Sequence, residues 1–346
     1  MAEQHNGEKA FGYRKVKSYA VNIKSPSQRQ SATKLAEDAP PPTRDLPAEH
    51  HWLSLPEGQV AVLGAGAQGD NASPLSWLDE SSIASARMLS DEGTTAQVDS
   101  ELFGQTLWIA CLDAGVTLVQ GRAKGISQAA DGSVREVTVQ QTSDGSTKIL
   151  PADRLVLAAG PWTGSLAKEL FPALTSQIAV PIKELPGHSI IFKAPHPLPA
   201  EAVFCTMRDA DATTGPECFT RPDGTIYVAG ENSGAPLPLG TYAVSKDENI
   251  LHKLRRAVDI IAPSLAALSA GKLAMNANVV KTQLCYRPIS TRGTPVLGRL
   301  PGAANVIVCS GMGPWGITLG PGSGKVVSEL VLDRTRLSAS IEMLAL

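Results

Sequence analysis

The chain has 346 residues, of which 43% are apolar and 18% charged, and its formal net charge is -2. This length exceeds what one compact core usually holds, so we expect two domains. The near balance of 31 basic and 33 acidic residues offers no basic surface for nucleic acid. No apolar run is long enough for a membrane span, and residues 1–7 are too polar for a secretory signal, so the sequence predicts a cytoplasmic protein.

The cysteines and histidines give no sign of a disulfide framework or a metal site. The five cysteines are scattered and form no C-x-x-C pair, and the six histidines lack metal-ligand spacing. We therefore predict reduced, buried thiols and no metal. The cysteines are Cys111, Cys205, Cys218, Cys285 and Cys309.

The first third of the chain mixes strand, loop and helix patterns. Residues 13–24 alternate apolar and polar side chains, which predicts a strand. Residues 25–51 are rich in Ser, Pro and charge, and are typical of a surface loop. Residues 73–89 predict a helix capped by Ser73, and residues 102–114 predict a second helix that ends at a glycine.

The pattern then changes to strands. Residues 116–120 and 122–127 predict strand structure, and residues 134–141 and 146–150 flank a Thr-Ser-Asp-Gly turn, which predicts a hairpin. The apolar run 155–159 is typical of a strand buried on both faces of a parallel sheet.

The second half predicts an antiparallel sheet followed by further helices. Short strands with Pro and Gly turns fill residues 178–228, and residues 247–273 predict a helix. A last buried strand covers residues 306–309, and the final helix covers residues 325–332. Parallel-type strands near both ends of an antiparallel middle imply two domains that share the chain discontinuously.

One glycine motif is ambiguous. Residues 64–69 (GAGAQG) follow an apolar run and match G-x-G-x-x-G, in which glycines let the backbone approach a pyrophosphate. The sequence after it, DNASP, starts its helix too late to point backbone amides at phosphate. We favour a surface loop, and a nicotinamide-dependent dehydrogenase built on this motif remains an alternative.

The C-terminal segment 305–324 (NVIVCSGMGPWGITLGPGSG) is more informative. A buried strand ends at Cys309, several glycines follow, and a helix starts near Gly316 or farther along. In a doubly wound sheet this places backbone amides and a positive helix end in the crevice at the carboxyl ends of the strands. A glycine-rich turn that only reverses the chain would give the same pattern.

Three other segments accompany it in a fixed order: LVLAAGPWTG at 155–164, FTRPDGTIYVAG at 219–230 and CYRPISTRGTPVLGR at 285–299. Together with the glycine segment they resemble the FAD-dependent oxidoreductases of the D-amino-acid oxidase, glycine oxidase and sarcosine oxidase superfamily. The resemblance is dense over residues 94–164 and 281–332 and thin elsewhere, and the two C-terminal elements are its most specific part.

The resemblance implies roles for particular residues toward FAD. Gly160, with Ala158 and Ala159, matches the strand end that passes close to the dinucleotide, and Ala123 matches the backbone position that contacts the adenine. The turn that holds the pyrimidine edge of the flavin ring corresponds to Gly311, Met312, Gly313, Gly316, Ile317 and Thr318.

Arg287 matches the arginine that anchors a substrate carboxylate in the amino-acid-oxidising members. A guanidinium binds a carboxylate bidentately and stays charged, which suits this role. The alternative is a structural arginine that caps backbone carbonyls at a sheet corner. His188 follows a Pro-Gly pair, and we expect a surface or strand-edge histidine rather than a general base.

Two departures from the family pattern stand out. Met312 occupies a position where the family commonly has a polar residue, often histidine. The family also opens with a strand, a G-x-G-x-x-G turn, a helix and an acidic residue, whereas residues 10–24 resemble a later strand of the substrate domain. The resemblance therefore predicts that the N-terminal dinucleotide-binding βαβ unit is missing or unrecognisable in this chain.

The fold expected from the resemblance is α/β, with an incomplete FAD/NAD(P)-binding Rossmann-like domain interleaved with an antiparallel-sheet substrate domain. We expect a substrate-domain strand and linker at 1–72, parts of the FAD-binding domain at 73–164 and 287–346, and the substrate domain at 165–286. The implied function is oxidation of a C–N bond of a small amine or amino acid by hydride transfer to flavin. A non-catalytic scaffold or trafficking factor derived from a flavoprotein is an alternative.

Overall fold

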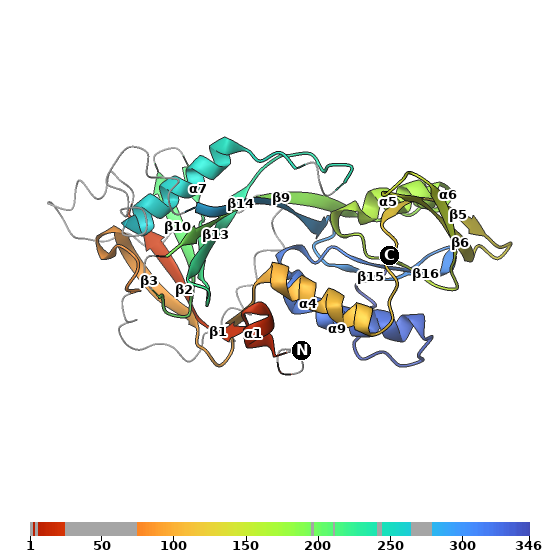
Figure 1. Ribbon diagram of the computed structural model, residues 1–346, viewed down its shortest axis with the longest axis horizontal. Helices are drawn as coiled ribbons and strands as arrows, with labels where there is room; N and C mark the ends of the chain where they lie inside the picture. Colours follow the sequence, from red (N-terminus) through yellow and green to blue (C-terminus); the bar gives the residue numbers. More distant parts are fainter. Residues whose placement is uncertain are drawn as a thin grey trace.

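The structure is a computed structural model that describes residues 6–24, 75–194, 197–209, 212–240, 244–263 and 279–346, together with residue 3. The chain forms two halves, each built around its own β-structure, at opposite ends of an elongated molecule (Figure 1). Among the described strands the two longest, β9 (Ile182–Lys193) and β14 (Val279–Ser290), run from one half toward the other.

One half is a large sheet with the strand order β14-β9-β13-β12-β10-β2-β3, and β11 pairs with β10 at the side. All of its pairings are antiparallel except that of β10 with β2. The strands are β2 (Lys17–Ile23), β3 (Ile83–Ser90), β9 (Ile182–Lys193), β10 (Glu201–Asp209), β11 (Ala212–Thr214), β12 (Glu217–Thr220), β13 (Thr225–Asn232) and β14 (Val279–Ser290).

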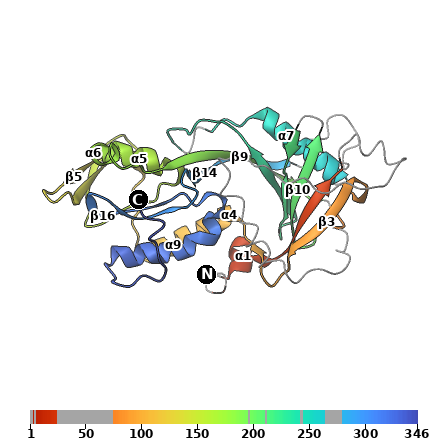
Figure 2. The same cartoon turned by 180° about the vertical axis from the view of Figure 1, so that it is seen from behind.

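Helix α7 (Glu248–Ile261) lies along the large sheet and closes its core, as Figures 1 and 2 show from opposite sides. Asp247 caps the helix by accepting a hydrogen bond from the backbone N–H of Asn249. Apolar side chains recur along one face of the helix, including Leu251 and Leu254, which are fully buried against the sheet. This packing is the largest core in the described part of the chain.

The other half holds two three-stranded sheets and several helices. The order β15-β16-β8 combines an antiparallel and a parallel pairing, and β5-β6-β7 is an antiparallel meander. The strands are β5 (Gly121–Gln128), β6 (Val134–Gln141), β7 (Thr147–Pro151), β8 (Leu155–Leu157), β15 (Val296–Leu300) and β16 (Ala303–Ser310). The helices are α4 (Ser100–Asp113), α5 (Thr163–Leu170), α6 (Pro172–Thr175) and α9 (Gly316–Val331).

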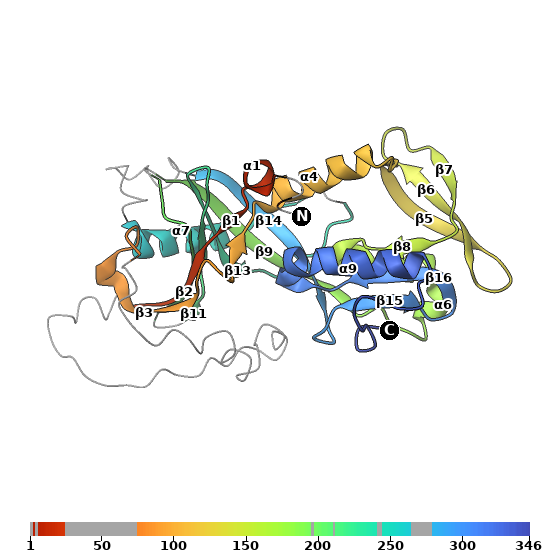
Figure 3. The same ribbon diagram turned by 90° about the horizontal axis from the view of Figure 1, so that it is seen from below.

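Strand β16 lies in the middle of this half and is covered on both faces. Val306 and Val308 pack with the meander and α5, whereas Ile307 packs with Val326 and Leu330 of α9. Figure 3 shows α9 beside β8 and β16, with α4 running nearby toward the meander. The short helix α1 (Gly7–Phe11) contacts α4, and β1 (Arg14–Lys15) pairs with β4 (Ala96–Gln97).

The structure confirms the α/β class and most of the expected elements. The strand at 13–24, the helix at 102–114, the hairpin at 134–150 and the parallel strand at 155–159 all form, with ends shifted by a few residues. Helix α9 starts at Gly316, at the earlier of the expected positions, so the prediction of a final helix only at 325–332 was too short. Of the expected helix 247–273, the described residues confirm α7.

Two expected elements were wrong. Residues 75–89 do not form a helix: a short 3-10 turn, η2 (Glu80–Ser82), leads into β3, which pairs with β2. Helix-favouring side chains such as Met88 are overridden there by backbone pairing with a neighbouring strand. Residues 116–120 form no strand. The glycine motif at 64–69 and the expected loop at 25–51 lie outside the described residues.

None of the helices in the described part of the chain combines the length and the apolar character that crossing a bilayer requires.

Candidate functional site

The parallel strands β8 and β16 end side by side, and each is followed by a glycine turn. Gly160 after β8 has φ 56°, and Gly311 and Gly313 after β16 have φ 85° and 56°. These left-handed conformations favour glycine. The hydroxyl of Ser310 donates a hydrogen bond of 2.9 Å to the carbonyl of Gly160, which holds the two turns together. The two turns therefore lie together at the carboxyl ends of these parallel strands, where the sequence predicted a crevice.

Helix α9 begins directly after the second of these turns. Its first residue is Gly316, and no side chain caps its N-terminus, because the residue before it is Trp315. The first backbone N–H groups of a helix have no partner within the helix, and they carry its positive end. Ile317 and Thr318 of this first turn are exposed. This terminus can therefore donate hydrogen bonds to an electron-rich ring carbonyl or an anion.

Strand β14 connects the large sheet to both turns. It contacts η3 (Gly160–Trp162) and η5 (Gly313–Trp315), the 3-10 helices that follow β8 and β16. Ile289 forms an isolated antiparallel bridge with Met312, and a Cβ at Gly311 would lie 3.0 Å from the Cβ of Ser290. Arg287 lies on the same strand, two residues before this bridge. The structure therefore brings the strand of Arg287 against the predicted flavin turn.

The guanidinium of Arg287 lies across the backbone of Gly187 on the neighbouring strand β9. A Cβ at position 187 would be 2.6 Å from Arg287 Nη1 and 2.9 Å from its Nη2, so a side chain there would displace the guanidinium from this position. Nη1 donates a hydrogen bond of 2.9 Å to Oδ1 of Asn232. The partner of Arg287 is thus a side-chain amide, whereas the alternative interpretation expected backbone carbonyls as its partners. Arg287 is half-buried, so part of its surface stays accessible.

Polar groups continue beyond Arg287 on the same face of the sheet. The hydroxyl of Ser189 lies 3.4 Å from Oε1 of Gln283, and it also hydrogen-bonds Tyr227. Burial raises the pKa of the Tyr227 phenol, although the Ser189 hydrogen bond and the charge of Arg287 oppose this rise. The phenol therefore stays neutral and protonated at physiological pH.

His188 lies in the interior of the large sheet, so the expectation of a surface or strand-edge histidine was wrong. Its side chain is 0% exposed, because β9 is flanked by β13 and β14 and covered by α7. Nε2 accepts a hydrogen bond of 3.0 Å from the backbone N–H of Asp247, and Nδ1 has no partner in the described residues. Burial lowers the pKa of His188. Its side chain faces α7, on the opposite side of the sheet from Arg287.

The remaining predicted positions lie around β8 and in the meander. Ala158 and Ala159 link β8 to η3 and lead directly into Gly160. Ala123 lies on β5 in the separate three-stranded meander, where it packs against the core that also contains Leu157 of β8.

Sequence reasoning missed Gly187, Asn232 and the polar group around Tyr227. A glycine inside a strand pattern signals a close approach of another group, and Gly187 carried that signal. No comparable signal marked Asn232, since only tertiary pairing brings it to Arg287.

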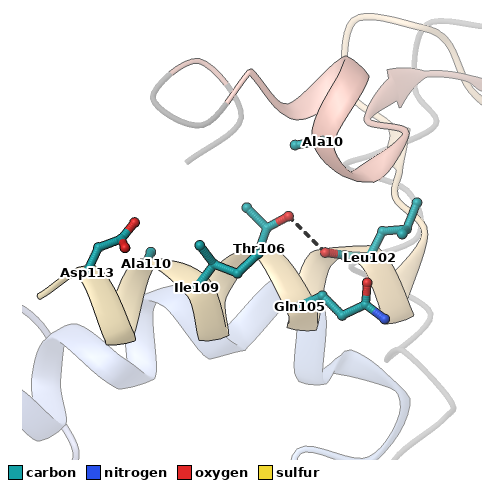
Figure 4. A pocket seen from close by; sticks show the side chains of 7 residues that line it. All are labelled: Ala10, Leu102, Gln105, Thr106, Ile109, Ala110 and Asp113. Carbon is teal, nitrogen blue, oxygen red and sulfur yellow. Dashed lines mark hydrogen bonds between the residues drawn. The ribbon is translucent and has the colours of Figure 1, made fainter. Parts of the chain in front are cut away.

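A hollow of about 610 Å³ lies between α1 and α4 (Figure 4). Its lining combines apolar and polar side chains of α4 with Ala10 of α1, and it contains none of the predicted site residues. The hydroxyl of Thr106 is already used within the helix, where it donates to the carbonyl of Leu102. Within the described residues, no three His, Cys, Asp or Glu side chains gather closely enough to hold a metal ion.

A comparison with models of known protein families assigns this chain to a family. A family model of FAD-dependent oxidoreductases (DAO) matches residues 67–330, which is most of the chain. The chain belongs to the FAD-dependent oxidoreductase family. The cofactor of this family is FAD, and the expected superfamily resemblance is confirmed.

Individual relatives agree with this family. A Schizosaccharomyces pombe protein with the general name oxidoreductase is 27% identical over 358 aligned positions, covering 99% of this chain and 78% of its own length. A D-amino acid dehydrogenase of Methylobacterium radiotolerans is 29% identical over 247 residues, and a glycine oxidase of Pseudomonas putida is 28% identical over 195 residues. The match covers 51% of the dehydrogenase and 45% of the glycine oxidase, so this chain spans about half of those two proteins.

Solved structures show the same fold at lower identity. Glycine oxidase from Geobacillus kaustophilus superposes with a TM-score of 0.65 at 16% identity, covering all of this chain and 78% of that one. An iminodiacetate oxidase from Chelativorans has a TM-score of 0.62 at 17% identity. The chain therefore has the fold of these flavoproteins.

Proposed function

We propose that this member of the FAD-dependent oxidoreductase family oxidises the C–N bond of a small amine or amino acid. The observation that carries the proposal is the position of Arg287, a half-buried guanidinium on the strand that contacts both glycine turns. The names of relatives, which include a glycine oxidase and a D-amino acid dehydrogenase, support the same substrate class.

The residues around the strand ends fit the flavin ring. A Cβ at Gly160 or Gly316 would meet nothing within 4 Å, so both positions leave open space beside the backbone. The uncapped N-terminus of α9 would hold the electron-rich edge of the ring. When bound there, FAD supplies the acceptor for a hydride from the substrate carbon.

The protein's own contribution would be binding and orientation. Arg287 would bind the substrate carboxylate through its guanidinium, which fixes the adjacent C–N bond toward the glycine turns. The neutral Tyr227 phenol adds a hydrogen-bonding group on the same sheet face without adding charge. His188 is not a candidate base in this proposal, because it faces α7 on the other side of the sheet.

The test is the visible absorption spectrum of the purified chain with added FAD, followed by anaerobic addition of amino acids. We expect a bound-flavin spectrum that bleaches with an amino acid, and about hundredfold less efficiently with the corresponding amine that lacks the carboxylate. Arg287→Ala should remove that preference while leaving the FAD spectrum unchanged. A folded protein that ignores FAD, or a carboxylate preference that persists without Arg287, would refute the proposal.

A second candidate is a non-catalytic scaffold that binds another protein. The observation in its favour is α4, which carries Leu102, Trp108, Ile109 and Leu112 on its surface and buries no residue. A folded, colourless chain that retains a specific protein partner would favour this function. The substrate itself and the cytoplasmic location stay predictions.

A further inference from the structure

Strand β13 contains a bulge that re-aims its last residues. Its register against β9 shifts between Val228 and Glu231, and Gly230 inside the bulge has φ 112°. A Cβ at position 230 would lie 2.2 Å from the carbonyl oxygen of Gly215, so the chain can bend here only with glycine. Because of the bulge, Asn232 stands opposite Gly187, the residue that supports the Arg287 guanidinium.

The segment after Asn232 is fixed by hydrogen bonds to three different elements. The backbone N–H of Ser233 donates to the carbonyl of Pro186 on β9 at 3.0 Å. The hydroxyl of Tyr286 donates to the carbonyl of Pro236 at 3.0 Å, and Nε1 of Trp162 donates to that of Pro238 at 2.7 Å. The backbone of Asn232 is therefore held on both sides, so its side chain is presented to Arg287 from a fixed position.

The hydrogen bond between Asn232 and Arg287 joins a neutral amide to a positively charged guanidinium. Oδ1 of Asn232 accepts from Nη1, and within the described residues Arg287 forms no ion pair. A carboxylate in place of the amide would make the same hydrogen bond but would also compensate the positive charge. The amide orients the guanidinium and leaves its charge available to a ligand.

We propose that Asn232 is a positioning residue, which holds the Arg287 guanidinium for the substrate carboxylate and keeps its charge uncompensated. This inference rests on the proposed function, in which Arg287 is the carboxylate anchor. Gly187 and Asn232 then act together: the glycine backbone supports the plane of the guanidinium, and the amide fixes one of its edges.

The experiment measures binding of benzoate, a carboxylate with no oxidisable C–N bond, to the full chain supplied with FAD. Isothermal titration calorimetry needs no turnover, so the readout is independent of activity. We expect Asn232→Ala to weaken benzoate binding about tenfold, the typical effect of losing a hydrogen bond to a charged group. Asn232→Asp should weaken it at least as much, although it keeps the acceptor oxygen, because its charge competes with the ligand.

Matched variants separate this role from a structural one. Asn22→Ala, which removes a surface hydrogen bond to Ser85 on the large sheet, should leave benzoate affinity unchanged. Asn232 is exposed, so its variants should keep the wild-type unfolding midpoint. If Asn232 were only structural, Asn232→Asp would bind benzoate as the wild type does, and the inference would be wrong.

Failure of this inference differs from failure of the proposed function. If Arg287→Ala abolishes benzoate binding but both Asn232 variants bind normally, only the positioning role of Asn232 is refuted. If Arg287→Ala binds benzoate as well as the wild type, the carboxylate anchor is refuted, and the role of Asn232 is refuted with it.

Discussion

Helices α7 and α4 both have 14 residues, yet they lie in opposite environments. Six residues of α7 are buried against the large sheet, whereas α4 buries none, although its sequence is the more apolar of the two. A helix that is apolar on most sides is normally enclosed by other elements. The half of the molecule with the large sheet is therefore packed by its own residues, while the half with the glycine turns leaves apolar surface uncovered in the described chain.

The strands show the same difference. In β9 every residue from Pro186 to Phe192 is buried, because strands lie on both sides and α7 covers one face. In β8 only Leu157 is buried, Val156 is 37% exposed, and the described residues pair this strand with β16 alone. The contrast teaches that the proposed substrate anchor, Arg287, lies on the more enclosed sheet, whereas the proposed cofactor turns lie in the less enclosed half.

The largest expected effect compares one leucine from each helix. Leu254→Ala on α7 removes a fully buried side chain and should lower the free energy of unfolding by about 3 kcal/mol. Leu112→Ala on α4 removes a side chain that is 45% exposed, and should cost no more than about 0.5 kcal/mol. Urea unfolding of both variants measures the difference. Equal losses would show that α4 is enclosed in solution and would remove the contrast.

Two glycines with positive φ offer a second, smaller contrast. Gly230→Ala in the β13 bulge combines a φ of 112° with a clash against Gly215, and should destabilise the fold by about 2 kcal/mol. Gly160→Ala, at φ 56° with open space around it, should cost about 1 kcal/mol. Chemical denaturation gives the stabilities, and FAD titration should show the larger loss of affinity for Gly160→Ala. A larger loss of stability for Gly160→Ala, or a larger loss of FAD affinity for Gly230→Ala, would contradict the different roles given to these two glycines.

The smallest expected effect concerns how the stability of the fold depends on pH, through His188 in the large sheet. Because burial lowers the pKa of folded His188, the unfolded chain binds a proton that the folded chain does not as pH falls below about 6.5. The contribution of His188 to stability is thus complete above this pH and is lost as pH falls toward the lowered folded value.

Urea midpoints between pH 7.5 and pH 5 measure this loss. His188→Gln, which keeps an acceptor for the Asp247 N–H but does not titrate, should show a shallower decline than the wild type. Parallel declines in the two proteins would mean that other groups dominate the pH dependence.

Local sequence signals predicted the elements whose pattern does not depend on a partner. The hairpin of β6 and β7 follows from its turn residues, and the helix at Gly316 follows from a buried strand and a run of glycines. The glycine positions around Gly160 and Gly311 were predictable because a left-handed backbone restricts residue choice. The family resemblance added Arg287, which no periodicity could have marked.

The wrong predictions concern segments whose structure depends on pairing with a neighbouring strand. Residues 83–90 have helix-favouring side chains, but they pair with β2 as an edge strand. His188 follows a Pro-Gly pair that reads as a turn, yet Pro186 and Gly187 continue β9 through the middle of the sheet. Both errors arise because strand pairing joins residues far apart in sequence, and such contacts leave no local periodic signal.

The sequence by itself determined the α/β class, the FAD-dependent family and the glycine turns, because these depend on local backbone requirements and on ordered motifs. Only the tertiary structure decided which groups surround Arg287: the bulge at Gly230 brings Asn232 opposite Gly187, and the guanidinium lies across that glycine. A guanidinium is oriented by groups within hydrogen-bond distance. Here those groups come from strands about 55 and 100 residues earlier in the chain, so folding had to bring them together.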